Sequence, residues 1–382
     1  MPQNKQPKLV RISEKLQQNM QYVDELMGLE TNFDIIHRVI RLGDTDACMY
    51  LIDGFCKDEL MQKILQYLMD LKAEDFPKDA HEMSKIAIPY VEVDLDDTWE
   101  KILGALLSGV FVLLLDGYEK AVLIDARTYP ARGVEEPDKD KVLRGSKDGF
   151  VETVVFNTAL IRRRIRSTDL HMEMLNAGEN SRTDIVLCYM ESRVDPKLLT
   201  QIRERIRSIQ VDALAMNQES LAECLYQRKW YNPFPKFKYT ERPDTAAAQV
   251  LEGNLVILVD NSPSAMVLPT TIFDVVEEAD DYYFPPVTGT YLRLTRFLIA
   301  LLTYFVTPTY LLLMNHRMWI PENLEFIILK EDPNVPLILQ FLLLELAIDG
   351  LRLAAVNTPN MLSTPLSVMA ALVLGEFSVE SG

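Results

Sequence analysis

The sequence predicts an α/β (α+β) soluble head in two parts, followed by an all-α transmembrane region. First, the stretch from Phe297 to Asn315 runs for roughly 19 residues without a charge, long enough for a helix to cross a hydrocarbon core of about 30 Å. Second, another apolar run, Val335 to Val356, follows at once. Third, the chain before these runs alternates short helix and strand patterns, which is typical of a mixed domain.

Basic and aromatic residues flank the first apolar run. Arg293 and Arg296 stand just before it, and His316, Arg317 and Trp319 just after it, where headgroup anchors are expected. The alternative interpretation is a buried core helix of a soluble enzyme. The second apolar run favours the membrane interpretation, because one core helix does not explain two such runs.

Net charge and cysteine usage exclude several classes of partner and site. A formal net charge of -17 opposes binding to nucleic acid, which needs basic surface to neutralise phosphates. The four cysteines are scattered, without a CxxC pair or a paired histidine, so we predict neither a zinc site nor a disulfide framework. They are Cys48, Cys56, Cys188 and Cys224. The N-terminus has no apolar signal segment, so we expect a cytosolic head.

Residues 1–30 read as a polar leader with one amphipathic helix, and residues 31–133 as the first α/β subdomain. Gly43-Asp44 and Asp116-Gly117 supply turn residues between strand patterns. Asp97, with Glu100 three residues on, marks a helix start. In order, we predict strands at 34–42 and 47–55, a helix at 59–71, a strand at 91–93, a helix at 97–108 and a hairpin of 110–115 with 121–124.

The charged, proline-containing stretch 134–140 predicts a boundary, and residues 141–285 form the second α/β subdomain. Pro196 after Asp195 marks the first turn of a helix. No internal repeat is visible. In order, we predict a helix at 149–166, strands at 170–175 and 185–190, helices at 196–209, 219–226 and 245–251, a hairpin of 255–259 with 266–268, and a helix at 272–278.

Residues 286–382 form the predicted transmembrane region, and three charges lie inside its second apolar run. Glu345, Asp349 and Arg352 are spaced four and three residues apart, so they share one helical face. A charge at membrane depth costs at least about 2.5–3.5 kcal/mol on insertion scales and must face protein, water or an opposite charge. One interpretation is a structural ion pair with Arg352. The other is a face that lines an ion path.

Beyond this helix, 357–360 predicts a turn, and the apolar stretch 365–377 is about 13 residues long, too short to span the membrane. We therefore expect the chain to be a fragment of a longer membrane domain, with a re-entrant segment as the alternative.

Two basic stretches in the head are weaker candidates. Arg162, Arg163, Arg164 and Arg166 lie at the end of a predicted helix, where positive charge opposes the negative end of the helix dipole. A solvated face explains them, and a contact between heads of an oligomer, or with anionic lipid, is the functional alternative. The segment 229–239 interleaves lysines with aromatics, but its prolines and the nearby membrane favour a packing strap or a membrane-surface contact.

The residues form no catalytic pattern. His37, His81, His171 and His316 lack metal-ligand spacing, and the sequence has no GxSxG, no GxGxxG after a strand and no GxxxxGK[ST]. Asp260-Asn261-Ser262 offers oxygen atoms, but a hairpin turn explains it. We predict that the chain is not an enzyme and that it uses no cofactor and no metal.

Several stretches resemble the spore germination receptor A-subunit (GerA) family, over about residue 30 to the end of the chain. Each alone is weak, but together they are specific. They are 146–152 (SKDGFVE), 157–165 (NTALIRRRI), 227–230 (QRKW), 232–235 (NPFP), 239–244 (YTERPD), 259–264 (VDNSPS), 289–293 (GTYLR) and 345–352 (ELAIDGLR).

The resemblance implies a cytosolic two-part head on a multi-span domain in the inner membrane of a bacterial endospore. It implies a role in germination, as an ion-conducting or nutrient-receptor subunit acting in ion release. The implied partners are membrane lipid, other copies of the chain and other germination membrane proteins, and it names no small-molecule germinant. The alternative is a non-conducting scaffold that organises other spore membrane proteins.

Overall fold

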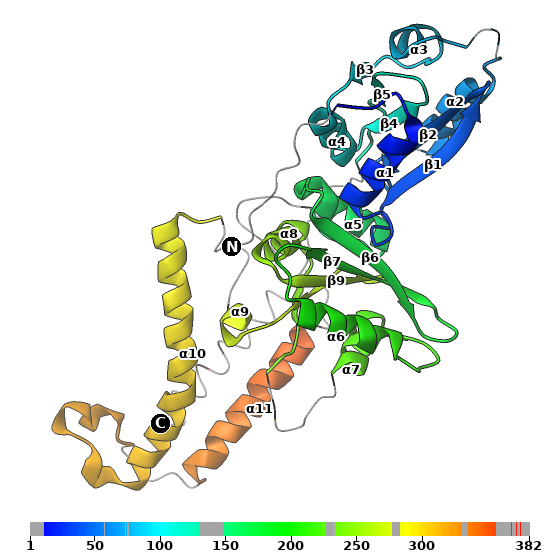
Figure 1. Cartoon of the computed structure of the whole chain (residues 1–382). Helices are drawn as coiled ribbons and strands as arrows, with labels where there is room; N and C mark the ends of the chain where they lie inside the picture. Colours follow the sequence, from blue (N-terminus) through cyan, green and yellow to red (C-terminus); the bar gives the residue numbers. More distant parts are fainter. Residues whose placement is uncertain are drawn as a thin grey trace. The chain divides into compact units, whose positions relative to one another are not determined.

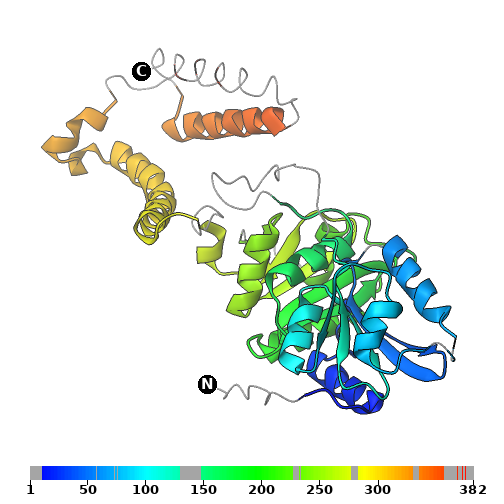
Figure 2. The same ribbon diagram turned by 90° about the horizontal axis from the view of Figure 1, so that it is seen from above.

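The computed structural model describes residues 11–56, 58–72, 74, 76–129, 148–226, 232, 234–276, 283–329 and 335–356, with 368, 372 and 375 as isolated positions. The chain divides into two compact units, Met1–Gly289 and Thr290–Gly382. The first unit contains two α/β lobes (Figures 1 and 2). We call them lobe 1 (residues 11–129) and lobe 2 (residues 148–276). The boundary predicted at 134–140 lies outside the described residues.

Lobe 1 is a five-stranded antiparallel sheet with helices on both faces. The strand order is β1-β2-β4-β5-β3. Its strands are β1 (Ile35–Leu42), β2 (Thr45–Ile52), β3 (Val93–Asp96), β4 (Phe111–Leu115) and β5 (Ala121–Ile124). Its helices are α1 (Leu16–Met27), α2 (Asp58–Met69), α3 (Ala80–Ile86) and α4 (Trp99–Leu107).

Alternating side chains of the strands build two cores. Ala47 and Met49 of β2 point to the face covered by α2 and α3. Cys48 and Tyr50 point to the face covered by α1 and α4. Every residue of β4 is buried, because both sides of this central strand are covered. The helix in the predicted leader, α1, is therefore part of lobe 1, since its apolar side chains complete the second core.

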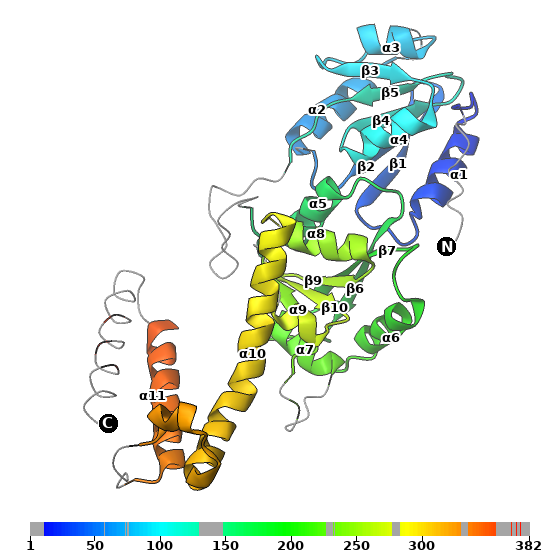
Figure 3. The ribbon, with the colours of Figure 1, turned by 90° about the vertical axis from the view of Figure 1, so that its left-hand side faces the viewer.

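Lobe 2 is also a five-stranded antiparallel sheet, with the order β6-β7-β9-β10-β8. Its strands are β6 (Leu170–Ala177), β7 (Thr183–Met190), β8 (Lys238–Thr240), β9 (Leu255–Val259) and β10 (Ala265–Leu268). Its helices are α5 (Val154–Arg164), α6 (Pro196–Arg207), α7 (Gln218–Leu225), α8 (Pro243–Glu252) and α9 (Ile272–Val276). Figures 1 and 3 show α8 and α7 on opposite sides of the sheet.

The two lobes are structural repeats of each other. From α1 to β5 and from α5 to β10, the elements follow in the same order: helix, two strands, two helices, strand, helix, two strands. The strands also occupy the same places in the two sheets. No repeat is visible in the sequence, and it becomes apparent only from the order of the elements and of the strands.

One shared device fixes the start of the first helix in each lobe. The turn after the fourth strand carries an aspartate whose Oδ1 accepts a hydrogen bond from the first helical N–H. Asp116 accepts from Leu16 at 2.9 Å, and Asp260 accepts from Val154 at 3.1 Å. Backbone N–H groups at a helix start have no partner inside the helix, so these carboxylates satisfy them.

The first helix of each lobe also contains a buried asparagine that makes the same pair of hydrogen bonds. The Asn19 amide bonds to both the N–H and the C=O of Ser13, at 2.8 and 2.6 Å. The Asn157 amide does the same with Val151, at 2.8 and 2.6 Å. Both asparagines are buried. Each therefore holds the chain that enters the helix, at a position where an apolar side chain leaves backbone groups unpaired.

The two lobes are joined by a buried ion pair and by backbone pairing. Arg162 of α5 binds Asp34 through two hydrogen bonds, Nε to Oδ2 at 2.7 Å and Nη2 to Oδ1 at 3.0 Å. The side chains are 0% and 2% exposed. Beside the pair, the Phe33 N–H donates to the Met172 carbonyl at 3.2 Å, and the Met172 N–H donates to Asn32 Oδ1 at 2.6 Å. The segment before β1 thus lies along the outer edge of β6.

The backbone approaches closely beside this ion pair. Gly54 has a φ of +77°, and a Cβ there would lie 3.2 Å from the Cβ of Ala159 in α5. Ile52, Phe55 and Ala159 form a small buried cluster with Tyr129 packed against it. A glycine is required at this position by both the conformation and the spacing.

The second unit is helical in its described part. It contains α10 (Pro286–Asn315, whose first turn belongs to the first unit), two short 3-10 helices (Arg317–Trp319 and Glu322–Ile327) and α11 (Leu337–Val356). By length and composition, α10 is the one described helix that meets the criteria for crossing a membrane. The helix α11 is 20 residues long and apolar apart from its three charged residues.

Candidate functional site

The charged residues predicted for the second apolar run lie on one helix. Glu345 and Asp349 are both in α11, one turn apart and exposed in the second unit. Arg352 lies on the same helix, and its side chain is outside the described part of the structure. Between them, a Cβ built on Gly350 meets no atom within 4 Å. The helix therefore presents two carboxylates on one face, as the spacing predicts.

The structure separates the four arginines of the basic cluster. Arg162 is fully buried and, besides Asp34, donates to the carbonyls of Ser167 at 3.3 Å and Leu170 at 3.2 Å. The hydrogen bonds of its guanidinium are therefore made within its own chain. This corrects the expectation that Arg162 contacts a neighbouring head, because its guanidinium reaches no solvent. Asp34, its partner, was not a predicted site residue and lies 128 residues away.

The other three arginines also contact their own chain. The Arg163 guanidinium lies over the Tyr129 ring, 4.4 Å from its centroid, and Arg166 Nη2 lies 3.5 Å from the Tyr129 hydroxyl. Arg164 pairs with Asp148 and donates to the Leu160 carbonyl at 3.0 Å. Arg163 and Arg166 nevertheless keep exposed surface. They are the members of the cluster that a neighbouring molecule can reach.

Three of the stretches that carry the family resemblance, 146–152, 239–244 and 259–264, meet around the start of α5. The Phe150 N–H donates to the Glu241 carbonyl at 2.8 Å, and the Asn261 N–H donates to the Glu152 carbonyl at 2.7 Å. Together with the Asp260 cap on Val154, these bonds tie three separate stretches to one another. They form the framework of lobe 2. No group of residues able to hold a metal ion occurs in the described part of the chain.

A second buried arginine, Arg242, belongs to the stretch 239–244 and was not a predicted site residue. It lies close to the start of α10. Arg242 is fully buried and binds Asp244 through Nε at 3.1 Å and Nη2 at 2.6 Å. The Tyr283 hydroxyl donates to Asp244, and the Arg242 guanidinium lies 5.7 Å from the Tyr283 ring centroid. Burial is the largest single effect and lowers the pKa of Arg242, but the hydrogen bonds and charge interactions with Asp244 and Tyr283 together outweigh it and raise the pKa overall. The arginine therefore stays charged.

This cluster anchors the chain just before α10. Tyr283 is followed by Phe284, Pro285 and Pro286, and α10 begins at Pro286. Two successive prolines restrict the backbone between the anchored ring and the helix. The backbone between the anchored Tyr283 and the first turn of α10 is therefore restricted.

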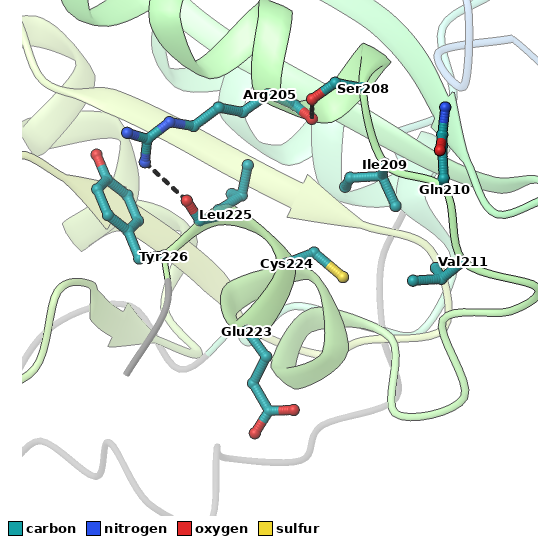
Figure 4. A pocket seen from close by; sticks show the side chains of 9 residues that line it. All are labelled: Arg205, Ser208, Ile209, Gln210, Val211, Glu223, Cys224, Leu225 and Tyr226. Carbon is teal, nitrogen blue, oxygen red and sulfur yellow. Dashed lines mark hydrogen bonds between the residues drawn. The ribbon is translucent and has the colours of Figure 1, made fainter. Parts of the chain in front are cut away.

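A cavity of about 640 Å³ lies beside α6 and α7 (Figure 4). Arg205 donates to the Leu225 carbonyl at 2.7 Å and lies 4.5 Å from the Tyr226 ring centroid. Figure 4 shows the Glu223 carboxylate pointing away from these groups. Burial raises the pKa of Cys224, so its thiol stays protonated and is a weak nucleophile at neutral pH. The residues that line this cavity do not form a catalytic arrangement. They are Arg205, Ser208, Ile209, Gln210, Val211, Glu223, Cys224, Leu225 and Tyr226.

Comparison with known proteins places the fold and these stretches in one family. A sequence model described as Bacillus/Clostridium GerA spore germination protein matches residues 21–382. Stage V sporulation protein AF of Bacillus subtilis (strain 168) is 37% identical, over 100% of this chain and 77% of that protein. Spore germination protein A1 of Bacillus subtilis is 30% identical, over 93% of this chain and 73% of that protein.

A solved structure is similar to the head. It is the crystal structure of the N-terminal domain of the A subunit of the Bacillus megaterium spore germinant receptor GerK3, with a TM-score of 0.54 and 26% identity. The match covers 69% of this chain and 98% of that one. The soluble α/β head is thus confirmed, and so is the resemblance read from the sequence. The chain belongs to the GerA spore germination protein family.

Proposed function

We propose that the chain is a membrane subunit of the spore germination machinery that acts in germination-triggered ion release. The observation that carries this proposal is the family match across residues 21–382, together with an apolar helix directly after the head. The solved relative of the head is part of a germinant receptor A subunit. We take this chain to be an ion-conducting or nutrient-receptor subunit of the same type, without enzymatic activity.

The second unit supplies the membrane part of the proposal. At about 1.5 Å per residue, the 30 residues of α10 extend about 45 Å, enough to cross a hydrocarbon core. Its apolar side chains are exposed, as lipid-facing side chains are expected to be. We propose that α10 and α11 both span the inner membrane of the spore, as parts of a multi-pass domain with a cytosolic head.

Glu345, Asp349 and Arg352 carry the sharpest prediction, because the two interpretations of this charged face differ in outcome. If the acids line an ion path, Glu345→Gln and Asp349→Asn keep their volume and hydrogen bonding, so the protein accumulates normally while cation release slows or changes its ion preference. We expect this result. It is measured as membrane abundance and potassium release from spores that carry each variant, with Glu322→Gln as a matched control outside the apolar runs.

A structural ion pair gives a different pattern. Removing one charge then leaves its partner buried and unpaired, which costs about 3–5 kcal/mol. Abundance falls in the single variants and recovers when either is combined with Arg352→Gln. Normal abundance together with normal release contradicts both interpretations.

Orientation follows from the distribution of charge. The loop from His316 to Pro336 holds Glu322, Glu325, Glu331 and Asp332 against Arg317 and Lys330. Basic residues favour the cytosolic side, so we propose that Arg293 and Arg296 lie there and the loop lies across the membrane. A cysteine at position 322 should react with a membrane-impermeant reagent from the far side. Labelling of this cysteine from the cytosolic side only refutes this topology.

We also propose that heads associate, and the exposed members of the basic cluster are the contact. An acidic chain offers carboxylates to Arg163 and Arg166, and a head-to-tail contact can close into a ring. Arg163→Glu with Arg166→Glu should reduce the oligomer on native gels, while the equally exposed Lys197→Glu should not. An unchanged oligomer leaves these arginines as a solvated face.

The second candidate function is a non-conducting scaffold that holds other spore membrane proteins through its two-lobed head. The head has the exposed edges and surfaces that such a role needs. Flux through liposomes that contain the full-length protein distinguishes the two candidates, because a scaffold alone carries no current.

A further inference from the structure

Strand β1 forms one edge of the lobe 1 sheet, and no strand in the described part of the chain pairs with its outer side. It is eight residues long. Ile36 is 38% exposed and Val39 is 51% exposed. A long edge strand with exposed apolar side chains is a template for pairing with another chain, so natural proteins cover it or protect it with charge.

The equivalent strand of lobe 2, β6, indicates which backbone N–H and C=O groups of β1 point away from the sheet. In β6, the third residue of the strand, Met172, points its N–H and C=O outward and binds Asn32 and Phe33. The third residue of β1 is His37. Because outward groups alternate along an edge, His37, Val39 and Arg41 direct their backbone groups to the free side.

A groove lies between this edge and α2. Its volume is about 480 Å³. Met61, Leu65 and Met69 follow each other at four-residue intervals on one face of α2, and Arg38 of β1 stands opposite them. Gln62 and Gln66 complete the lining. The groove is therefore an apolar trough with one guanidinium at its side.

The same place in lobe 2 is closed by charge. Glu173, the fourth residue of β6, is bound by Arg203 of α6 at 2.7–3.0 Å, and Arg207 lies 3.6 Å away. The residues at these positions in lobe 1 are Arg38, Leu65 and Met69. Lobe 1 has an arginine where lobe 2 has a carboxylate, and apolar side chains where lobe 2 has two arginines. Lobe 1 thus lacks the internal closure that lobe 2 has.

Charge decides what fits the open edge. Strand β1 (IIHRVIRL) carries Arg38 and Arg41 and no acidic residue, within a chain of net charge -17. Neither arginine has an ion-pair partner among the residues that the structure describes. Pairing of β1 with β1 of a second copy, centred on Val39, offers no carboxylate to either arginine. Arg38 and Arg41 are three residues apart, so Arg38 points to the groove face of the sheet and Arg41 to the other face. A strand with carboxylates on that other face pairs with Arg41.

We propose that the β1 edge and the α2 groove bind an extended segment of a partner protein in which acidic and apolar side chains alternate. Its backbone pairs with His37, Val39 and Arg41. Its apolar side chains enter the groove between Met61 and Met69. Its carboxylates lie on the opposite face of the sheet and bind Arg41. This is strand addition, in which the main chain supplies affinity and alternate side chains supply specificity.

A short fluorescent peptide of alternating valine and glutamate tests the proposal against the full chain in detergent. We expect saturable binding that Arg41→Glu weakens by at least about tenfold, since the substitution replaces an attraction with a repulsion. A lysine version of the peptide should prefer the Arg41→Glu variant over the unchanged chain. The control is Lys63→Glu, the same charge change on an exposed part of α2 outside the groove, which should bind the acidic peptide normally.

A version of the peptide with N-methyl groups on alternate backbone nitrogens separates strand addition from simple charge attraction. It cannot pair with an edge strand, so it should not bind. Equal binding of the methylated peptide, no effect of Arg41→Glu, or no saturable binding of the acidic peptide overturns the proposal. A dimer of the chain that the peptide does not displace but Val39→Lys disrupts assigns the edge to a second copy, and also overturns it.

Discussion

The head depends on one buried ion pair, between Asp34 and Arg162. Two charges removed from water cost more than their attraction returns unless every donor and acceptor is satisfied. Here the guanidinium forms two bonds to the carboxylate and two more to the carbonyls of Ser167 and Leu170. Each lobe therefore contributes groups that only the other can satisfy. This makes the relative placement of the lobes specific, in addition to the apolar contact around Gly54.

Two copies of one fold have been used differently. Both keep the aspartate that caps the first helix and the asparagine that holds the entering chain, because these satisfy backbone groups that any sequence leaves unpaired. The outer edge diverges. In lobe 2 the segment before β1 and the Glu173–Arg203 pair close it, whereas in lobe 1 β1 remains open beside a groove. Comparison with β6 thus shows which closing contacts β1 does not have among the described residues.

Local pattern was sufficient for most elements and insufficient for what joins them. Alternation and turn residues located the hairpins β1–β2, β4–β5 and β9–β10, and long apolar runs located α10 and α11. Three elements of the head differ: α3 was not predicted, β8 was assigned to a packing strap, and α1 was placed in a leader. Each of these elements is short or is stabilised by packing on the sheet, so local sequence pattern indicates it only weakly. The partner of Arg162 could not be found, because helix periodicity carries no information about a residue 128 positions away. The charged face of α11 could be predicted because its residues are close in sequence. The burial of Arg162 could not, because it depends on residues far away in sequence.

Hydrogen exchange of the Phe33 and Met172 amides in the full-length protein tests most directly whether the buried pair holds the lobes together. Wild type should protect both amides as well as the core strands β7 and β9. Asp34→Asn or Arg162→Met leaves one buried group without its partner, at a cost of about 3–5 kcal/mol, so exchange should accelerate by roughly two to three orders of magnitude. The double variant, which buries no unpaired charge, should recover much of the protection. Equal exchange in wild type and both single variants contradicts the account.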